Sequence, residues 1–268
     1  MDVVAFESIE LIGVTQVFKT IGEDVAALDG VDFSAKRNEF ITVLGPSGSG
    51  KTTIFNLLAG LLRPTSGSVL VNGEPLTGVN PHVAYMFQQP GLLDWRDVLG
   101  NVVIGQEFLG MPKKAARAEA MDGLAAFGLA GFESRHPWEL SGGMRQRVAL
   151  LRTYLTHRDL LLLDEPFGAL DALTRLQMQQ FLLDQWQRDQ RTVVFITHDV
   201  EEALLFGDRV LVMAPRPTYV QATVEVGFER PRNAEELLAD PDFVELKHQL
   251  LSMLFDGRAD HADGEAAS

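Results

Sequence analysis

Residues 45–52 have the spacing of a phosphate-binding loop. The stretch Gly45-Pro46-Ser47-Gly48-Ser49-Gly50-Lys51-Thr52 follows the pattern G-x-x-x-x-G-K-[ST]. Its glycines let the backbone curl so that successive N–H groups point inward, and the positive end of the following helix points to the same place. The natural ligand is a polyphosphate, with Lys51 at its β- and γ-phosphates and the Thr52 hydroxyl helping to hold Mg²⁺. An ordinary glycine turn is the alternative, which the strand before and the helix after make the weaker one.

Two adjacent carboxylates, Asp164 and Glu165, end the apolar run Leu160 to Leu163. A buried strand that ends this way places its carboxylates at the carboxyl edge of the sheet, where open α/β sheets bind ligands. Asp164 is then positioned to hold Mg²⁺ through water, and Glu165 to polarise an attacking water as general base. Alone, the pair could simply cap the strand before the turn at Pro166, but beside a phosphate loop the catalytic interpretation is favoured.

A second anion site is predicted where Ser141-Gly142-Gly143 opens a helix, because the first N–H groups of a helix have no internal partner. The longer stretch Leu140 to Arg147, LSGGMRQR, resembles the signature loop of ATP-binding cassette (ABC) proteins. The other motifs stand in that family's order. They are Phe18 as the adenine-stacking ring, Gln88 as the glutamine loop, Gly168-Ala169-Leu170-Asp171 as the D-loop, and His198 as the switch histidine.

The resemblance covers residues 9 to about 235 and implies an ATPase that uses ATP and Mg²⁺. Its implied catalytic residues are Lys51, Glu165 and His198, and its implied metal ligands are Thr52, Gln88 and Asp164. The implied nucleotide contacts are Phe18, Gly45, Pro46, Ser47, Gly48, Ser49, Gly50, Lys51, Thr52, Thr53, Gln88, Ser141, Gly142, Gly143 and Asp171. In the family the signature faces the γ-phosphate bound to a second copy, so the resemblance implies a dimer that holds two ATP molecules at its interface.

Several of these residues have a plainer interpretation. Phe18 is one of 16 phenylalanines and could belong to the core. His198 alone would more often cap a helix or lie on the surface, and Gln88 could be an ordinary loop amide. The remaining histidines, His82, His136, His157, His248 and His261, have no metal-ligand spacing, so we expect them to be surface or packing residues.

The elements that would position these motifs follow from the hydrophobic pattern. Short apolar runs predict strands at residues 9–14, 31–33, 40–44, 69–71, 83–87, 160–163, 193–196 and 210–213. From Thr52 a helical stripe of Ile54, Leu57, Leu58, Leu61 and Leu62 follows the glycine loop. Residues 89–158 are rich in Ala, Leu and charge, with breaks at Pro112 and Pro137, and predict a helical insertion.

The expected fold is therefore α/β, and the resemblance specifies it further. It implies a P-loop NTPase (RecA-like) core with a mixed sheet, an antiparallel β subdomain, and a helical insertion that carries the signature. The expected nucleotide-binding domain spans residues 9–235. A helical C-terminal extension is expected over residues 236–268, with a disordered tail from His261 to Ser268. The acidic C-terminal region as a whole would contain amphipathic helices at Ala234 to Leu238 and Phe243 to Phe255.

Composition excludes several classes of protein. The 268 residues contain no cysteine, which rules out disulfides, a thiolate nucleophile and a cysteine zinc site, and fits a reducing cytosol. A net charge of -14 argues against nucleic-acid binding, although residues 225–268, with 11 acidic and 4 basic side chains, carry half of it. No run reaches the roughly 18 apolar residues of a membrane span, and the N-terminus lacks a signal peptide.

Gln89 to Val98, with Asn101 and Val102, resembles the segment of importer ATPases of the nitrate, sulfonate and taurine group that lies where the permease inserts its coupling helix. Asp94 stands where that group usually has proline, and buried packing is the plain alternative for Leu92, Leu93 and Trp95. Pro166 to Arg175 also looks like that group. The resemblance implies a peripheral subunit on the cytoplasmic face of the membrane, with a second ATPase copy, a permease and an extracytoplasmic binding protein as partners.

Two other functions are weighed against this importer. A soluble ABC ATPase for DNA repair or translation would usually bring paired cassettes, long coiled-coil insertions or basic surfaces, and a nucleotide-sensing module would not need Glu165 and His198. The solute itself stays open between nitrate, taurine, other alkanesulfonates and a thiamine precursor. The acidic C-terminal region regulates the protein or simply packs against the core, and packing is the favoured interpretation.

Overall fold

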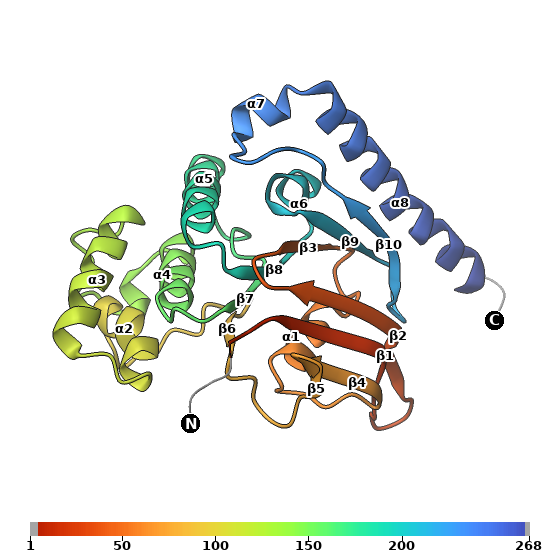
Figure 1. Ribbon diagram of the computed structural model, residues 1–268, viewed down its shortest axis with the longest axis horizontal. Coiled ribbons are helices and arrows are strands. Elements are labelled where there is room, and N and C mark those ends of the chain that lie inside the picture. Colours follow the sequence, from red (N-terminus) through yellow and green to blue (C-terminus); the bar gives the residue numbers. More distant parts are fainter. Residues whose placement is uncertain (1–4, 266–268) are drawn as a thin grey trace.

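The computed structural model describes residues 5–265, and from residue 256 onward it describes the backbone alone. Its strands form two sheets (Figure 1). The first is antiparallel, in the order β2-β1-β4-β5, and the second has the order β10-β9-β3-β8-β7-β6. The strands are β1 Ser8–Phe18, β2 Val25–Lys36, β3 Phe40–Leu44, β4 Ser66–Val71, β5 Glu74–Pro75, β6 Val83–Met86, β7 Leu160–Asp164, β8 Thr192–Thr197, β9 Arg209–Met213 and β10 Val220–Glu225.

The six-stranded sheet brings three motifs to one edge. Strands β3, β7 and β8 are parallel neighbours, with Leu44 opposite Thr197 and Asp164 opposite Ile196. All three strands are buried along their whole length, as expected for central parallel strands. Their carboxyl ends therefore place the phosphate loop, the carboxylate pair and His198 side by side. Since β10 is antiparallel to β9, the sheet is mixed.

Eight α-helices and one short 3-10 helix are described among residues 5–265. They are α1 Lys51–Leu58, α2 Val98–Phe108, α3 Lys113–Ala126, η1 Pro137–Glu139, α4 Gly142–Tyr154, α5 Ala172–Asp189, α6 Val200–Phe206, α7 Ala234–Leu238 and α8 Pro241–Glu265. Helices α2, α3 and α4 form a lobe beyond the β6 edge of the sheet (Figure 1). Pro112 is the N-cap of α3, and Pro137 is the first residue of η1, so both prolines lie at breaks. The predicted fold class is confirmed.

The helix after the phosphate loop is shorter than its apolar stripe. Ile54, Leu57 and Leu58 are buried as predicted, but α1 ends at Leu58, and Leu61 lies 53% exposed beyond it. Gly60 has a φ of +69°, and a Cβ there would lie 1.9 Å from the carbonyl oxygen of Gly78. The helix therefore has to end here, and the prediction that Leu61 and Leu62 continue its stripe was wrong.

The apolar core is divided by the large sheet. One cluster lies between the two sheets around α1, and a second joins the opposite face of the large sheet to α5 and the helical lobe. Phe40, Phe195 and Phe206 stack within the second cluster, with Phe40 and Phe206 centroids 5.4 Å apart. A third cluster packs α8 on α6, β9 and β10 through Phe243 and Leu250.

The C-terminal extension consists of α7 and α8, which run along the β10 side of the molecule (Figure 1). Both predicted amphipathic segments are helical. Helix α8 continues through Glu265, so the stretch from His261 to Glu265, expected to be disordered, is helical. Residues 266–268 lie outside the described range, and the boundary at residue 235 stays a prediction. Among the described residues, no helix is both long and apolar enough to cross a membrane.

Candidate active site

Lys51 begins α1 and reaches back across the phosphate loop. Its Nζ donates to the carbonyl oxygens of Gly45 and Pro46, at 2.8 Å each, and lies 3.5 Å from Ser49 Oγ. Gly48 and Gly50 have positive φ angles of 78° and 91°, which curl the backbone as predicted. Burial lowers the pKa of Lys51, and the nearby Glu165 and Asp164 oppose that shift.

Asp164 and Thr52 contact each other at the floor of this site. Thr52 Oγ1 donates to Asp164 Oδ2 at 2.9 Å, and Asp164 is only 2% exposed. Burial raises the pKa of Asp164 to about 6, with a smaller upward contribution from Glu165, against the lowering effects of the Thr52 hydrogen bond and Lys51. Lys51 and Thr52 therefore only partly offset the cost of burying the negative charge of Asp164.

Glu165 has a backbone conformation that is rare for a residue with a side chain. Its φ is +46°, in the left-handed region. The backbone is held there because Glu165 N–H donates to Ile196 O at 3.0 Å, and Gln146 Nε2 donates to Glu165 O at 3.2 Å. Non-glycine residues in this region cluster at functional sites, where surrounding contacts fix them. The conformation supports a functional role for Glu165.

Two further predicted residues meet the Glu165 carboxylate. Gln88 Nε2, just after β6, donates to Glu165 Oε2 at 3.4 Å, and His198 Nδ1, just after β8, lies 3.3 Å from the same oxygen. The His198 side chain is 59% exposed and that of Glu165 is 17% exposed. The imidazole and the carboxylate thus stand at the surface, where a ligand can reach them.

A cavity of about 300 Å³ opens in front of these groups. Its lining residues come from the phosphate loop, α1, the ends of β6 and β7, and the β9–β10 loop. They are Ser47, Gly48, Ser49, Gly50, Lys51, Thr52, Thr53, Gln88, Asp164, Glu165 and Arg216. Pro46 lines an adjoining cavity with Ser47 and Arg216.

Arg216 is a lining residue that the sequence motifs do not indicate. It precedes a cis peptide bond to Pro217 in the β9–β10 loop, which Thr218 ties to the phosphate loop through a hydrogen bond from its Oγ1 to Ser49 O. Only this fold brings residue 216 beside residues 45–52, so no local spacing could reveal it.

The predicted signature lies elsewhere on the chain. Ser141 is the N-cap of α4 and accepts from Met144 N–H at 3.2 Å, and Asp171 caps α5 by accepting from Thr174 N–H at 3.1 Å. Gly143 packs so closely on the D-loop that a Cβ there would lie 3.3 Å from Ala169 O. None of Ser141, Gly142, Gly143 and Asp171 lines the phosphate-loop cavity. Phe18 does not line it either, and stands 39% exposed at the end of β1.

The oxygen ligands present fit Mg²⁺ better than a metal that needs several protein ligands. No cluster of three His, Cys, Asp or Glu residues suited to a metal occurs in the described part of the chain. Mg²⁺ is usually held by one or two carboxylates, with substrate phosphates and water completing its shell. One buried carboxylate beside a hydroxyl, facing a phosphate loop, meets that requirement.

The comparisons with known proteins agree with these motifs. The sequence profile of the family described as "ABC transporter" matches residues 28–168. An uncharacterized ABC transporter ATP-binding protein of Methanocaldococcus jannaschii is 43% identical, over 90% of this chain and 89% of its own length. A taurine import ATP-binding protein of Pseudomonas syringae pv. tomato is 41% identical, over 89% of this chain and 93% of its own length.

The fold has close counterparts among solved structures. A dimeric ATP-binding cassette in a post-hydrolysis state with ADP and Pi superposes with a TM-score of 0.75. It is 31% identical, and the match covers 82% of this chain and all of that one. The fold of this chain is therefore that of an ATP-binding cassette.

Proposed function

Because the chain belongs to the ABC transporter family and is an ATPase that binds ATP, we propose that it is the ATP-hydrolysing subunit of a solute importer. Six groups of its own would carry the chemistry. Lys51 and the loop N–H groups would bind the phosphates, and Thr52 and Asp164 would hold Mg²⁺, which would supply positive charge to neutralise the phosphates. Glu165 and His198 orient the attacking water.

The contacts of Glu165 support this division of roles. Its Oε2 is held between Gln88 and His198, so the second carboxylate oxygen is free to face a water molecule. Phosphoryl transfer depends chiefly on positioning and charge neutralisation, and a carboxylate fixed by two neighbours supplies both. Gln88 would couple nucleotide binding and hydrolysis at this site to movement of the helical lobe that follows it in the chain.

Dimerisation is part of the proposal. Ser141 caps an exposed helix N-terminus that is separate from the phosphate loop of its own chain, so we assign it to the γ-phosphate bound by a second copy. Each hydrolysis site would then combine the phosphate loop of one protomer with the signature of the other. The dimeric cassette among the similar structures supports this arrangement.

The observation that carries the importer role is the exposure of Trp95. Residues 89–97 precede α2, and the side chain of Asn101 in α2 forms hydrogen bonds with the backbone of this segment. Its Oδ1 accepts from Leu93 N–H at 2.7 Å, and its Nδ2 donates to Leu93 O, Arg96 O and Asp97 O at 3.0–3.1 Å. Trp95 is 78% exposed on this rigid segment, so the plain alternative of buried packing does not describe it. A rigid exposed tryptophan is suited to a protein interface.

A permease is the proposed partner at this segment, which would place the protein on the cytoplasmic face of the membrane. Similarity to taurine import proteins supports a solute of the nitrate, sulfonate and taurine type, which an extracytoplasmic binding protein would deliver. A soluble ABC ATPase and a nucleotide sensor remain the competing functions.

Site-specific photocrosslinking tests the importer role. A photoreactive phenylalanine analogue replaces Trp95 in one variant and Trp138 in a control, since Trp138 is 66% exposed in the same helical lobe. In native membranes we expect the Trp95 variant to crosslink to a protein with several membrane spans, identified by mass spectrometry, and the Trp138 variant not to. Equal crosslinking from both positions, or none from Trp95, would contradict the proposal.

A further inference from the structure

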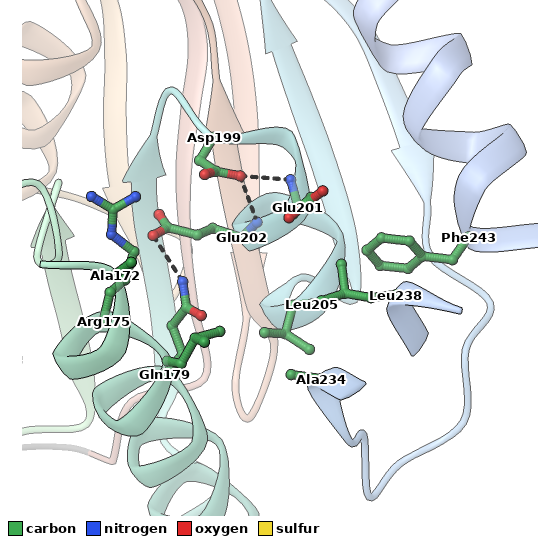
Figure 2. A pocket seen from close by; sticks show the side chains of 11 residues that line it. Ala172, Arg175, Gln179, Asp199, Glu201, Glu202, Leu205, Ala234, Leu238 and Phe243 are labelled. Carbon is green, nitrogen blue, oxygen red and sulfur yellow. Dashed lines mark hydrogen bonds between the residues drawn. The ribbon is translucent and has the colours of Figure 1, made fainter. Parts of the chain in front are cut away.

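A second cavity lies between α5, α6 and the C-terminal extension, away from the phosphate loop (Figure 2). Its volume is about 220 Å³. Helix α5 follows the D-loop and α6 follows His198, so two of its walls lead directly to the candidate active site. The third wall comes from α7 and the start of α8, and all of the lining residues lie beyond the residues 28–168 that match the ABC transporter profile.

One side of this cavity carries charges of both signs. Arg175 and Gln179 project from α5, and Glu202 projects from α6 towards them (Figure 2). Glu202 is 6% exposed and accepts from Gln179 Nε2 at 3.0 Å. Asp199 also lines the cavity and caps α6, accepting from Glu201 N–H at 2.8 Å. The neighbouring Glu201 is paired with Lys247 of α8. Glu202 also accepts from Thr197 Oγ1 at 2.6 Å, but within the described residues no salt bridge joins Arg175, Asp199 or Glu202 to another charged group.

Arg175 has hydrogen-bonding capacity to spare. Its Nη2 donates to Leu170 O at 3.3 Å, but its Nε is buried, and no acceptor in the described part of the chain bonds to it. A buried donor without a partner is destabilising, so such groups are normally satisfied. Because Arg175 lines the cavity, a small shift of its side chain would bring this donor to an acceptor on a bound ligand.

The opposite side of the cavity is apolar. Leu205 comes from α6, Ala234 and Leu238 from α7, and Phe243 from α8, and Figure 2 shows them facing the polar side chains. Phe243 is 1% exposed and Leu238 is 41% exposed, which indicates a closed inner end and an accessible mouth at Leu238. A bound molecule would therefore contact charge on one side and hydrocarbon on the other.

We propose that this cavity is an effector site for a small zwitterion with an apolar body, in the chemical class of the neutral α-amino acids. A simple anion would be repelled by Glu202 and Asp199, and a simple cation would leave Arg175 Nε unsatisfied. A zwitterion avoids both problems, because its α-carboxylate can lie near Arg175 while its α-ammonium lies near the carboxylates of Glu202 and Asp199. At about 220 Å³ the cavity is smaller than the roughly 300–1,000 Å³ of usual ligand pockets, so only a molecule about as small as a single amino acid would fit.

Occupancy of this site affects ATP hydrolysis in this scheme. Arg175, Asp199 and Glu202 also border a small pocket that contains Glu165 and His198. A molecule that joins α5 to α6 and the C-terminal extension therefore changes the freedom of the segments that carry Asp171 and His198. The effector role rests on the ATPase activity of the family, whereas binding itself is measurable without nucleotide.

Thermal denaturation with matched ligands tests the binding. Leucine, its deaminated analogue 4-methylpentanoate and its decarboxylated analogue 3-methylbutylamine are added separately at millimolar concentration to the full-length chain. We expect leucine to raise the Tm. Each analogue should bind at least about tenfold more weakly than leucine and shift the Tm less, because each lacks one charge-assisted contact. No Tm shift with leucine, methionine or phenylalanine would overturn the site, and an equal shift with either analogue would overturn the zwitterion class.

Variants on α7 localise the effect. Ala234→Trp fills the cavity from its apolar side, and Leu238→Trp blocks its mouth with less disturbance of the core. Glu235→Trp, on the exposed surface of the same helix, is the matched control. We expect the ligand-dependent Tm shift to disappear in the first two and to persist in the control. An unchanged shift in a folded Leu238→Trp variant would overturn the location. Binding without any change in steady-state ATP turnover would overturn the effector role.

Discussion

His198 Nδ1 lies 3.3 Å from Glu165 Oε2, so the residues that follow two neighbouring strands, β8 and β7, contact each other through their side chains. Gln88 Nε2, at 3.4 Å, contacts the same oxygen from the end of a third strand. The carboxylate of Glu165 is therefore positioned from both sides by groups that are 77 and 33 residues away in the chain. Parallel pairing of β6, β7 and β8 makes this meeting possible.

The first prediction concerns Glu165. Glu165→Gln keeps the size of the side chain and its contacts but removes the basic oxygen, so ATP binding should persist while turnover falls by about a hundredfold or more. A nucleotide-bound dimer should then accumulate, which light scattering at saturating ATP would detect. Turnover near the wild-type rate would refute the assigned role, and a variant that stays monomeric with ATP bound would contradict the dimer.

The second prediction concerns the hydroxyl of Thr52. Thr52→Val keeps the volume but removes the group that bonds to Asp164 Oδ2 at 2.9 Å. We expect a higher Mg²⁺ concentration for half-maximal ATP hydrolysis and roughly tenfold slower turnover, because the metal loses an oxygen ligand. Thr52→Ser retains the hydroxyl and should restore both values. If valine leaves the Mg²⁺ titration unchanged, Thr52 is not a metal ligand.

Much of this site could be predicted because its motifs are local. Each of the segments 45–52, 164–165 and 141–143 combines a turn or cap with one element, so short spacing encodes its geometry. The meeting of residues 45–52 with residues 164–165 also follows, since residues after parallel strands collect at one sheet edge, whereas residues 141–143 lie away from that edge. The strands predicted at residues 40–44 and 160–163 match β3 and β7 to within one residue because continuous burial leaves an unbroken apolar run.

Other features depend on contacts that no local pattern contains. Helix α1 ends early because Gly60 approaches Gly78, a tertiary contact, although the apolar stripe continues. Arg216 reaches the phosphate loop only because Thr218 ties two distant segments together. The cavity beside α6 likewise requires α5, α7 and α8 to converge. The sequence predicts the elements here, but not their packing.

The third prediction tests Arg216. It is exposed at the rim of the phosphate-loop cavity, where its charge can meet a phosphate or the ribose of a bound nucleotide. Arg216→Ala should raise KM for ATP several-fold with a smaller change in kcat, since an exposed charged contact contributes about 1 kcal/mol. Arg63→Ala removes an exposed charge away from this cavity and serves as the control. Equal effects of the two substitutions would contradict a specific role.

The fourth prediction concerns Arg232, which is 3% exposed beneath α6. Its Nη1 donates to the carbonyl oxygens of Leu204, Leu205 and Gly207, and thereby satisfies the C-terminal end of that helix. Arg232→Met should lower the free energy of unfolding by about 3 kcal/mol, because it leaves several buried acceptors without donors. Urea denaturation measures the change. Arg188→Met, at an exposed position, should stay within about 0.5 kcal/mol of the wild type.

The fifth prediction is a pH dependence of stability that originates at Glu202. Burial raises the pKa of this carboxyl and Asp199 adds to the shift, while Thr197, Gln179 and Arg175 oppose it. Between the ordinary glutamate pKa and this raised value, the folded state binds more protons than the unfolded state, so its stability falls as pH rises. Glu202→Gln cannot titrate. The free energy of unfolding of the variant minus that of the wild type should therefore increase with pH across this window and level off above it. Urea denaturation from about pH 4 to 8 measures this difference, and Glu235→Gln, which removes an exposed carboxylate, is the control. A difference that stays constant with pH for Glu202→Gln would show that its carboxyl titrates alike in both states.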